Sequence, residues 1–484
     1  MNYPRRQLCK FASAFIVATF PFAVDAAVWT IVPSVETGIT YTDNFLFAAK
    51  GNEADETVLE VIPSIRAQSS EGPVQGGINY GIDNLFYAHV PDRNSSQQLL
   101  RGYGSAELFR DLFFVNATGM ISHQAITPAA ASNVGALSVS LDSTEVSTWN
   151  VSPYFQQTIG GMLVWRAGVN LNVVNYKALL PDSFSRESFF SASSGPGAED
   201  LHWTLDIKVN DTYYSGQLSD VRHESAEMGL RYKFLPEWAV TGRLGYADYK
   251  YQYVTVVDDE PRGKIWRVGA AWLPSARTEL EVGISRHVFG RSKYGSFAYT
   301  GRRLFCSINT EEVVTNRRQL QTDYRAYVLT DPQTHLPIIN PETQSEITVY
   351  VPFLTETEEI FVNKINRIRT GIKSDEISIS FFGYHDHRRY QTTSGTEKVS
   401  GEGVTTNFVL SRRTSLEANI NQSNVISISA LKTETTDMSA SVLRTFGTGV
   451  KGSINIQRRE GSSTDILLTH FVAYSISTRV VMDF

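Results

Sequence analysis

The sequence contains little cysteine, which excludes a disulfide-based scaffold. Only two cysteines occur among 484 residues, and Cys9 lies in an N-terminal stretch that we expect to be removed. Cys306 then remains alone and cannot form an internal disulfide. We interpret it as a structural or incidental residue.

Long hydrophobic runs are also missing. Apart from the N-terminus, no stretch approaches the roughly 18–20 consecutive apolar residues that a membrane-spanning helix needs. Apolar residues spaced three or four apart, the pattern of an amphipathic helix, are nearly absent. The formal net charge of −6 indicates that the chain is not a general nucleic-acid binder.

The N-terminus has the pattern of a bacterial secretory signal. Three basic residues precede a short apolar run, and Val24-Asp25-Ala26 offers a small-residue cleavage site. We therefore expect residues 1–26 to be a signal peptide used by the Sec pathway, with the mature chain beginning near Ala27. RRQLCK is a weak match to a twin-arginine signal, but a barrel destined for a membrane must be exported unfolded.

Apolar and polar residues alternate in segments of about ten residues. In 471–484 the even positions are nearly all apolar, and the odd positions are mostly small or polar. The same alternation occurs in 74–88, 279–288, 376–381 and 415–421. A period of two indicates β-strands whose two faces meet different surroundings.

The connections between these segments fall into two length classes. Very short turns such as Gly160-Gly161 alternate with longer polar segments, among them 177–201 and 313–360. Short turns on one side and long loops on the other are typical of outer-membrane β-barrels. Aromatic residues lie beside the short turns and indicate an interfacial girdle: Phe109, Phe113, Phe234, Trp238, Trp272, Phe446 and Phe484.

The sequence therefore predicts an all-β fold, a single transmembrane antiparallel β-barrel over residues 27–484. In hydrocarbon every backbone donor and acceptor must be paired within the protein, and a sheet achieves this only by closing on itself. The alternation gives about 20 strands, within a range of about 18–22, provided that 202–221 lies outside the ladder or adds a paired hairpin. Secreted soluble β-sandwich domains would explain the alternation but not the two classes of connection.

Location and partners follow from this fold. We expect the outer membrane of a Gram-negative bacterium, contact with its lipid, and insertion by the barrel-assembly machinery, whose C-terminal signal the terminal Phe484 resembles. Segment 313–360 is too long for a plain loop, and we expect it to constrict the lumen or to cover the outer mouth. Only a few residues separate Ala27 from the first strand, which argues against a plugged siderophore transporter.

Charge is unevenly distributed along the mature chain. Residues 27–260 hold 14 Lys and Arg against 27 Asp and Glu, whereas residues 261–484 hold 27 against 22. Arg367, Arg369 and Arg479 fall within predicted strands, where a lipid-facing guanidinium would cost about 2–4 kcal/mol at the membrane midplane. We therefore expect these side chains to face the lumen and to line a path for anionic or acidic-sugar solutes. The alternative is that they pair with acids across the barrel and only stiffen it.

Two stretches carry a more specific pattern. VETGITYTDNFLF (35–47) ends in a YTDN motif, and WLPSARTELEVGISRHVFGRSKYGSFAYTGRRLFCSINTEEV (272–313) combines W-x-P-S-x-R-T with R-x-x-F-G and a basic-turn hairpin. Together they resemble the family of outer-membrane β-barrel proteins associated with the PEP-CTERM/exosortase system, along the whole mature chain. Members of that family accompany exopolysaccharide biosynthesis loci, so the resemblance implies exopolysaccharide and export components as partners. It transfers no catalytic residue.

The motif residues also have a structural interpretation. We expect Trp272 to lie at the bilayer interface, Pro274 and Ser275 to form a turn, and Arg277 to bond strand-end carbonyls or a neighbouring turn. We expect Asp43 and Asn44 to cap the loop after strand one. The two motif sets are Tyr41, Thr42, Asp43 and Asn44, and Trp272, Pro274, Ser275, Arg277 and Thr278.

Candidate chemistry is sparse. His385 and His387 would share one face of a strand, but no further metal ligand follows in evident register, and no nucleophile and base can be paired. We therefore predict no enzyme, no metal and no cofactor. The resulting hypothesis is an outer-membrane barrel that takes part in export or surface assembly of exopolysaccharide, most simply as a pore. A general diffusion porin is the first alternative, followed by a hydrolase at the barrel rim and an adhesin.

Overall fold

The computed structural model describes residues 28–69, 72–125, 143–177, 181–198, 200–215, 220–251, 262–315, 361–391, 395–464 and 470–484. The expected signal peptide lies outside the described residues. So does the predicted constriction at 313–360, except for 313–315, which end a strand. No helix in the described part of the chain is long and apolar enough to cross a membrane.

The described residues form one antiparallel sheet of 22 strands. The first eleven strands are β1 (Thr30–Thr42), β2 (Glu56–Ser69), β3 (Val74–Tyr87), β4 (Ser95–Phe109), β5 (Phe113–Ala125), β6 (Ser143–Ile159), β7 (Leu163–Tyr176), β8 (Ser183–Ser194), β9 (Leu201–Tyr214), β10 (Val221–Leu235) and β11 (Trp238–Tyr251). The remaining eleven are β12 (Arg262–Ser275), β13 (Thr278–His287), β14 (Gly290–Thr300), β15 (Leu304–Thr315), β16 (Phe361–Lys373), β17 (Ile377–Tyr390), β18 (Thr396–Ser411), β19 (Thr414–Ile426), β20 (Lys432–Gly447), β21 (Val450–Ser463) and β22 (Phe471–Asp483).

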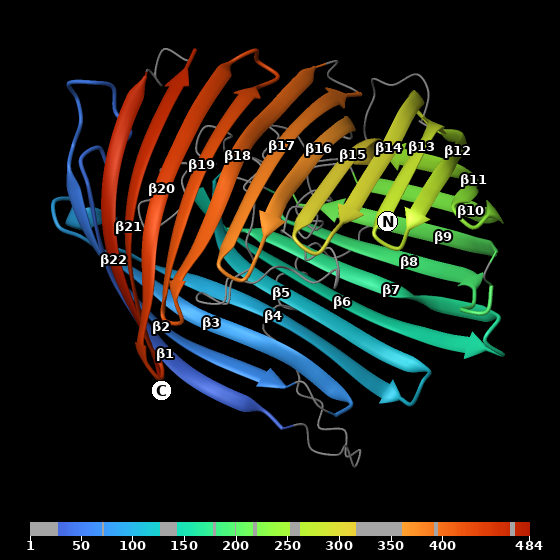
Figure 1. Ribbon diagram of the computed structural model, residues 1–484, viewed down its shortest axis with the longest axis horizontal. Helices are drawn as coiled ribbons and strands as arrows, with labels where there is room; N and C mark the ends of the chain where they lie inside the picture. Colours follow the sequence, from blue (N-terminus) through green and yellow to red (C-terminus); the bar gives the residue numbers. More distant parts are fainter. Residues whose placement is uncertain are drawn as a thin grey trace.

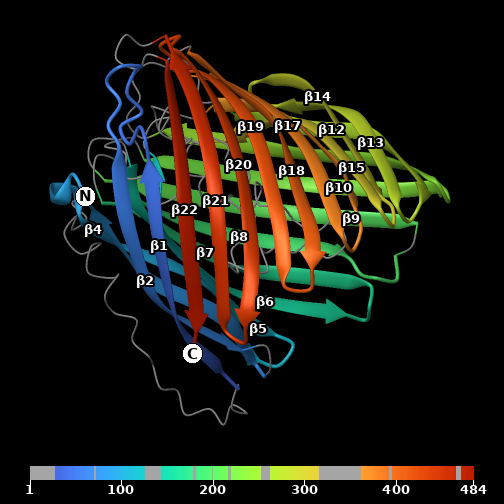
Figure 2. The ribbon, with the colours of Figure 1, turned by 60° about the vertical axis from the view of Figure 1, so that its left-hand side comes forward.

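The sheet closes into a barrel. Each strand pairs with its neighbours along the chain, and β1 pairs with β22 as well as with β2, with Ser34 opposite Asp483. Figures 1 and 2 show β22 lying beside β1, where the two ends of the wall meet. Closure leaves no free sheet edge at this joint, which satisfies the backbone polar groups in a membrane. The predicted fold class is therefore confirmed.

The strand number lies at the upper end of the predicted range because one hairpin was difficult to recognise. Residues 177–201 are expected to be a loop, but they contain β8, which pairs with β7 and β9. The sequence of β8, SFSRESFFSASS, is half serine and therefore has the composition of a loop. Its register nevertheless places Phe184 and Phe190 on the outward face, opposite Tyr213 and Ile207 of β9.

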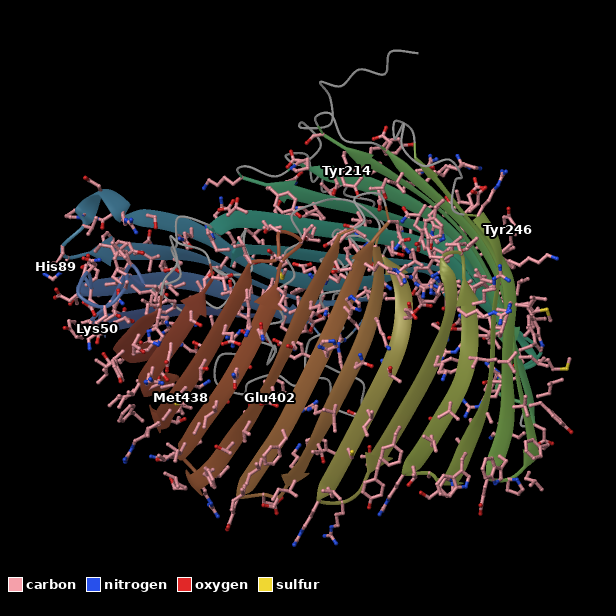
Figure 3. All side chains as sticks on the ribbon, turned by 90° about the horizontal axis from the view of Figure 1, so that it is seen from above. Lys50, His89, Tyr214, Tyr246, Glu402 and Met438 are labelled. Carbon is pink, nitrogen blue, oxygen red and sulfur yellow. The ribbon has the colours of Figure 1, made fainter. Side chains whose placement is uncertain are left out.

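The two faces of the wall differ as the alternation predicts. Large exposed apolar side chains occupy one face of each strand, as on β22, where Tyr474, Ile476, Val480 and Met482 are all exposed. Aromatic side chains next to the short turns are exposed too, which agrees with an interfacial girdle: Phe109, Phe234, Trp238, Phe446 and Phe484. Small apolar clusters lie on the inner side near the long loops, such as Phe45 with Val58, Leu85 and Tyr87. Figure 3 shows side chains on both surfaces of the wall.

Matched substitutions test this assignment of faces. Ile454 of β21 is outward-facing and 53% exposed, and the adjacent Asn455 faces inward. We expect Ile454→Arg to lower the free energy of unfolding by about 2 kcal/mol, because it places a guanidinium against hydrocarbon. Asn455→Arg should have little effect, because its neighbours are the inward Ser441 and Ser477. Urea unfolding in lipid vesicles, followed by tryptophan fluorescence, measures both, and equal losses would contradict the assignment.

Candidate functional site: the inner wall and its pocket

Arg479 lies on the inner face and joins three strands. Its Nη1 is 2.8 Å from Glu36 Oε1 of β1, and its Nη2 donates to Glu60 Oε2 of β2 at 2.7 Å. Asp83 of β3, also buried on the inner side, lies in the same acidic group. Arg479 therefore neutralises carboxylates across the joint at which the barrel closes.

Arg367 and Arg369 of β16 also lie on the inner face. They alternate along the strand with Ile368 and Ile372, which are exposed on the outward face. The Nη2 atom of Arg367 is 3.8 Å from Asp386 Oδ2, and the guanidinium carbon of Arg369 lies 5.1 Å from the ring centre of Phe305. The structure thus brings Arg367 and Arg369 together but places Arg479 in a separate cluster. A solute path along these residues stays a prediction.

A buried ion pair on β17 and β18 lies beside them and has no local sequence signal. Arg388 is fully buried, and its Nη1 donates to Glu397 Oε2 at 2.9 Å. Tyr390 donates its hydroxyl hydrogen to the same oxygen at 3.1 Å. Glu397 is only 2% exposed, so both charges are held almost entirely out of water.

Many inward charges are paired with one another. Some pairs lie within one sequence half: Arg243 with Glu227, Arg267 with Glu281, and Arg459 with Asp437. Others join the two halves: Arg231 with Glu279, and Arg479 with Glu36 and Glu60. This pattern favours the alternative in which the arginines pair with acids. The unequal charge of the two sequence halves therefore does not become a basic wall facing an acidic wall, because acids from both halves alternate with the arginines.

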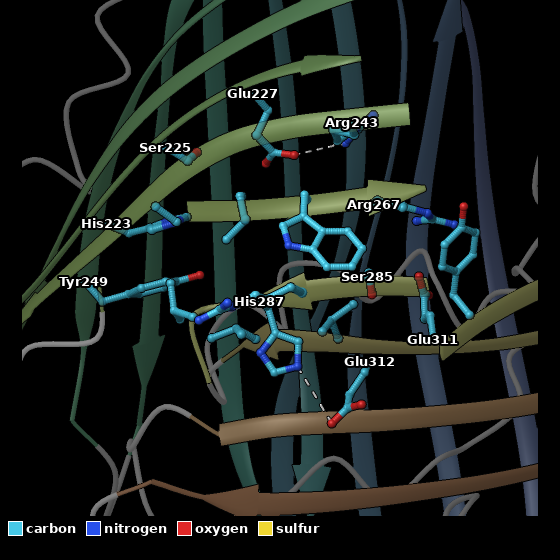
Figure 4. Close-up of a pocket in the computed structure, with 18 residues that line it drawn as sticks. His223, Ser225, Glu227, Arg243, Tyr249, Arg267, Ser285, His287, Glu311 and Glu312 are labelled. Atoms are coloured by element: carbon cyan, nitrogen blue, oxygen red, sulfur yellow. Dashed lines mark hydrogen bonds and ion pairs between the residues drawn. The ribbon is translucent and has the colours of Figure 1, made fainter. Parts of the chain in front are cut away.

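A pocket of about 310 Å³ opens in the inner wall between β10 and β15 (Figure 4). Glu227 and Arg243 form one ion pair on its floor, 3.5 Å apart, and the guanidinium of Arg267 stacks on the Tyr294 ring at 3.3 Å. His223 and Tyr249 stack with their ring centres 4.1 Å apart. Stacked rings beside paired charges form a surface that can bind a polar ligand with an apolar face.

The pocket depends on a short hairpin. Residues 288–289 alone connect β13 to β14, and Gly290 adopts a φ of 148°, which favours glycine. The ladder between β14 and β15 ends at Gly295 and Thr310, although β14 continues to Gly290. Beyond that point the two strands diverge, and His287 Nε2 approaches Glu312 Oε1 at 3.8 Å. The R-x-x-F-G motif could be seen in the sequence. That the neighbouring β14–β15 ladder ends early could be seen only from the strand register in the structure.

The YTDN motif holds the closing joint. Asp43 Oδ1 accepts a hydrogen bond from the Tyr474 amide at 2.7 Å, and Asn44 Nδ2 donates to the Val472 carbonyl at 3.1 Å. The amide of Asn44 donates to Thr42 Oγ1 at 3.3 Å, and Tyr41 is an exposed outward residue opposite Ile476. Asn44 caps the loop as expected, because its Nδ2 donates to the Ala48 carbonyl at 2.8 Å and its Oδ1 accepts from the Ala48 amide at 2.9 Å. Asp43 instead bonds β22, so the motif also ties β1 to β22, which no local pattern could reveal.

In the W-x-P-S-x-R-T motif, Pro274 lies in the strand and not in the turn that we expected it to form. Pro274 belongs to the end of β12 at a register shift, so it does not form the turn itself. Ser275 Oγ accepts from the Arg277 amide at 3.2 Å and donates to Thr278 Oγ1 at 3.1 Å. The Arg277 carbonyl accepts from the Thr300 amide at 2.8 Å. Trp272 packs near Trp238, with ring centres 6.1 Å apart.

The two histidines do not assemble a site with the acid between them. His385 and His387 lie on the outward face of β17, whereas Asp386 is buried on the inner face, because neighbouring strand residues point to opposite sides. Among the described residues no group of three or more His, Cys, Asp or Glu is arranged to hold a metal ion. The geometry offers no support for a rim hydrolase built on these residues.

Comparisons with known proteins bear on the fold. No family model and no curated protein matches the chain. Among solved structures it is similar to the FrpB iron transporter of Neisseria meningitidis (TM-score 0.55, 10% identity, covering 94% of this chain and 82% of that one). It is also similar to the siderophore receptor PirA of Acinetobacter baumannii (TM-score 0.53, 7% identity, 95% and 81% covered). A mutant of the ferric enterobactin receptor PfeA of Pseudomonas aeruginosa matches as well (TM-score 0.51, 8% identity, 93% and 81% covered).

These similarities define the class of fold. The chain is a closed β-barrel of the kind found in Gram-negative outer-membrane proteins. At such low identity the likeness extends to the fold alone.

Proposed function

We propose that this barrel is an outer-membrane pore that takes part in the export or surface assembly of exopolysaccharide. The observation that carries the proposal is the chemistry of the inner wall, where amides, hydroxyls and charged groups of neighbouring strands bond one another. Ser152 donates to Asn170, which donates to Glu187, at 2.5 and 2.9 Å. Such a wall offers donors and acceptors to a hydroxyl-rich chain without a strong field of one sign.

Aromatic rings on the inner face support a saccharide as the molecule that the lumen binds. Tyr103 faces the interior, opposite Gly77, yet 56% of it is exposed. The guanidinium of Arg166 lies between the rings of Tyr154, at 3.6 Å, and Phe189, at 5.4 Å. The C–H faces of sugar rings can pack on such aromatic surfaces, while their hydroxyls bond the neighbouring amides. The pocket between β10 and β15 offers the same combination.

The PEP-CTERM-associated resemblance supports the biological setting, with exopolysaccharide and export components as partners. A general diffusion porin is the second candidate. It is favoured by the closed wall itself, because a barrel with this many strands has room for an aqueous lumen. The two candidates differ in whether the lumen binds the polymer.

Planar-bilayer recordings distinguish them. We expect purified exopolysaccharide of the host to block the current through the wild-type pore, and Tyr103→Ala to weaken that block about threefold by removing an aromatic contact. Tyr232→Ala is the matched control, because Tyr232 is 49% exposed on the outward face. A large current that the polymer leaves unblocked would favour the porin. Periplasmic accumulation of polymer in a deletion strain would be independent support for export.

A further inference from the structure

Four cations lie on the outer surface of the barrel near the end that carries the long loops. Lys264 of β12, Arg286 of β13, and Arg291 and Lys293 of β14 are all exposed. Their registers put them on the same face as lipid-exposed side chains. Lys264 is opposite Tyr246, Lys293 is opposite Ile284, and Arg291 is opposite Arg286, which is itself opposite Trp266. We call these four residues the outward basic patch.

The outward basic patch differs from the surface of β8–β11 in having no counter-charges among the described residues. On β8–β11 the outward cations are matched by outward acids: Arg186 with Asp211 at 3.1 Å, Arg222 with Glu224 at 2.6 Å, and Lys250 with Asp248 at 3.4 Å. None of the four patch residues forms an ion pair within the described part of the chain. The nearby Glu312 carboxylate approaches His287 instead. Among the described residues, the patch therefore presents positive charge towards the membrane without a paired acid.

The level of the patch is that of the lipid headgroups. Directly below it the wall is apolar, with Val268, Val282 and Ile284 about half exposed. Tyr246, at the outer surface in Figure 3, and Trp266 lie at the transition and resemble the aromatic girdle of a membrane interface. Short turns mark the periplasmic side, so the patch faces the outer leaflet.

Among the described residues, the backbone of β14 beside the patch has no ladder partner on the side of β15. The ladder between β14 and β15 ends at Gly295 and Thr310, and the patch residues Arg291 and Lys293 lie on the part of β14 beyond it. An open strand edge is costly in hydrocarbon but can be satisfied at the level of a polar headgroup. A headgroup with amides and hydroxyls would supply those partners, in addition to phosphates for the cations.

We propose that the outward basic patch binds the phosphorylated headgroup of an outer-leaflet glycolipid. Arg286 and Arg291 are suited to phosphate because a guanidinium can donate two parallel hydrogen bonds to it. Lys264 and Lys293 add flexible point charges on either side. The acyl chains of the same lipid lie along the apolar wall below. Arg286 is also among the residues that line the pocket between β10 and β15, so the two sites share one residue.

Native mass spectrometry of the full-length protein in detergent tests the proposal, with bis-phosphorylated lipid A as the probe. Replacing all four patch residues by Gln should weaken binding more than about tenfold. The matched control replaces four exposed cations at the short turns, Arg302, Arg303, Arg412 and Arg413, by Gln and should change binding less than about twofold. Resistance of the barrel to SDS before heating confirms that each variant is folded.

Two further lipids test which groups of the headgroup the patch recognises, the phosphates or the sugar. Dephosphorylated lipid A should bind as weakly to the wild type as lipid A binds to the patch variant. Phosphatidylglycerol, which has a phosphate but no sugar, should bind more weakly than lipid A. Equal binding of phosphatidylglycerol would overturn the assignment to a glycolipid, and equal loss in the patch and control variants would overturn the site itself.

Discussion

Arg388→Met should destabilise the barrel more than any other single substitution considered, by about 3–5 kcal/mol. Arg388 is fully buried, and its removal leaves Glu397, which is 2% exposed, without its cation. Tyr390 would still donate to that carboxylate, but one neutral hydrogen bond does not compensate for a buried charge. Urea unfolding in lipid vesicles, followed by tryptophan fluorescence, measures the loss.

A double variant separates the charge effect from a packing effect. Adding Glu397→Gln to Arg388→Met removes the unpaired buried charge and keeps an acceptor for Tyr390. Most of the lost stability should therefore return. Arg389→Met is the matched control, because Arg389 is exposed on the outward face of the same strand. If the double variant is as unstable as Arg388→Met, the arginine stabilises the wall by its size and the electrostatic explanation is wrong.

Arg479→Met should cost about 3 kcal/mol and should weaken the closing joint in particular. Its guanidinium is the cation that bridges Glu36 of β1 and Glu60 of β2 from β22. Without it, two carboxylates from neighbouring strands repel each other at the place where the first and last strands meet. Hydrogen exchange of the β1 and β22 amides should rise more than exchange elsewhere in the wall.

Neutralising the two acids provides the control for the joint. Arg479→Met combined with Glu36→Gln and Glu60→Gln should regain stability, because no charge is left unpaired. Arg458→Met, on the outward face of β21, removes a cation that pairs with Glu460 at 2.7 Å near a strand end, where both partners are in contact with solvent. That variant should lose less than about 1 kcal/mol. An equal loss in both arginine variants would show that closure does not depend on the Arg479 cluster.

The alternation of residues could predict the fold because each strand meets two solvents. On β22 the even positions face lipid and the odd positions face the interior, and Arg479 falls on the inner side as its parity requires. β8 shows the limit of this method. Its serines and its Arg186 give no clean alternation, and only pairing with β7 and β9 identifies it as a strand.

The sites were less predictable because their members come from different strands. Arg367, Arg369 and Arg479 could be identified as inward by parity, but not their acid partners, since Asp386, Glu36 and Glu60 lie on other strands. The same holds for YTDN, whose Asp43 and Asn44 contact residues more than 400 positions away.

By itself the sequence determined the period of two, the two classes of connection and therefore a closed transmembrane wall, because these features depend on local contact with lipid, water and turn geometry. Only the tertiary structure decided which charges meet inside, where the β14–β15 ladder ends, and that the four cations of the outward basic patch form no ion pair among the described residues. Those features depend on the register between strands, and a register brings together residues that have no relation to one another along the chain.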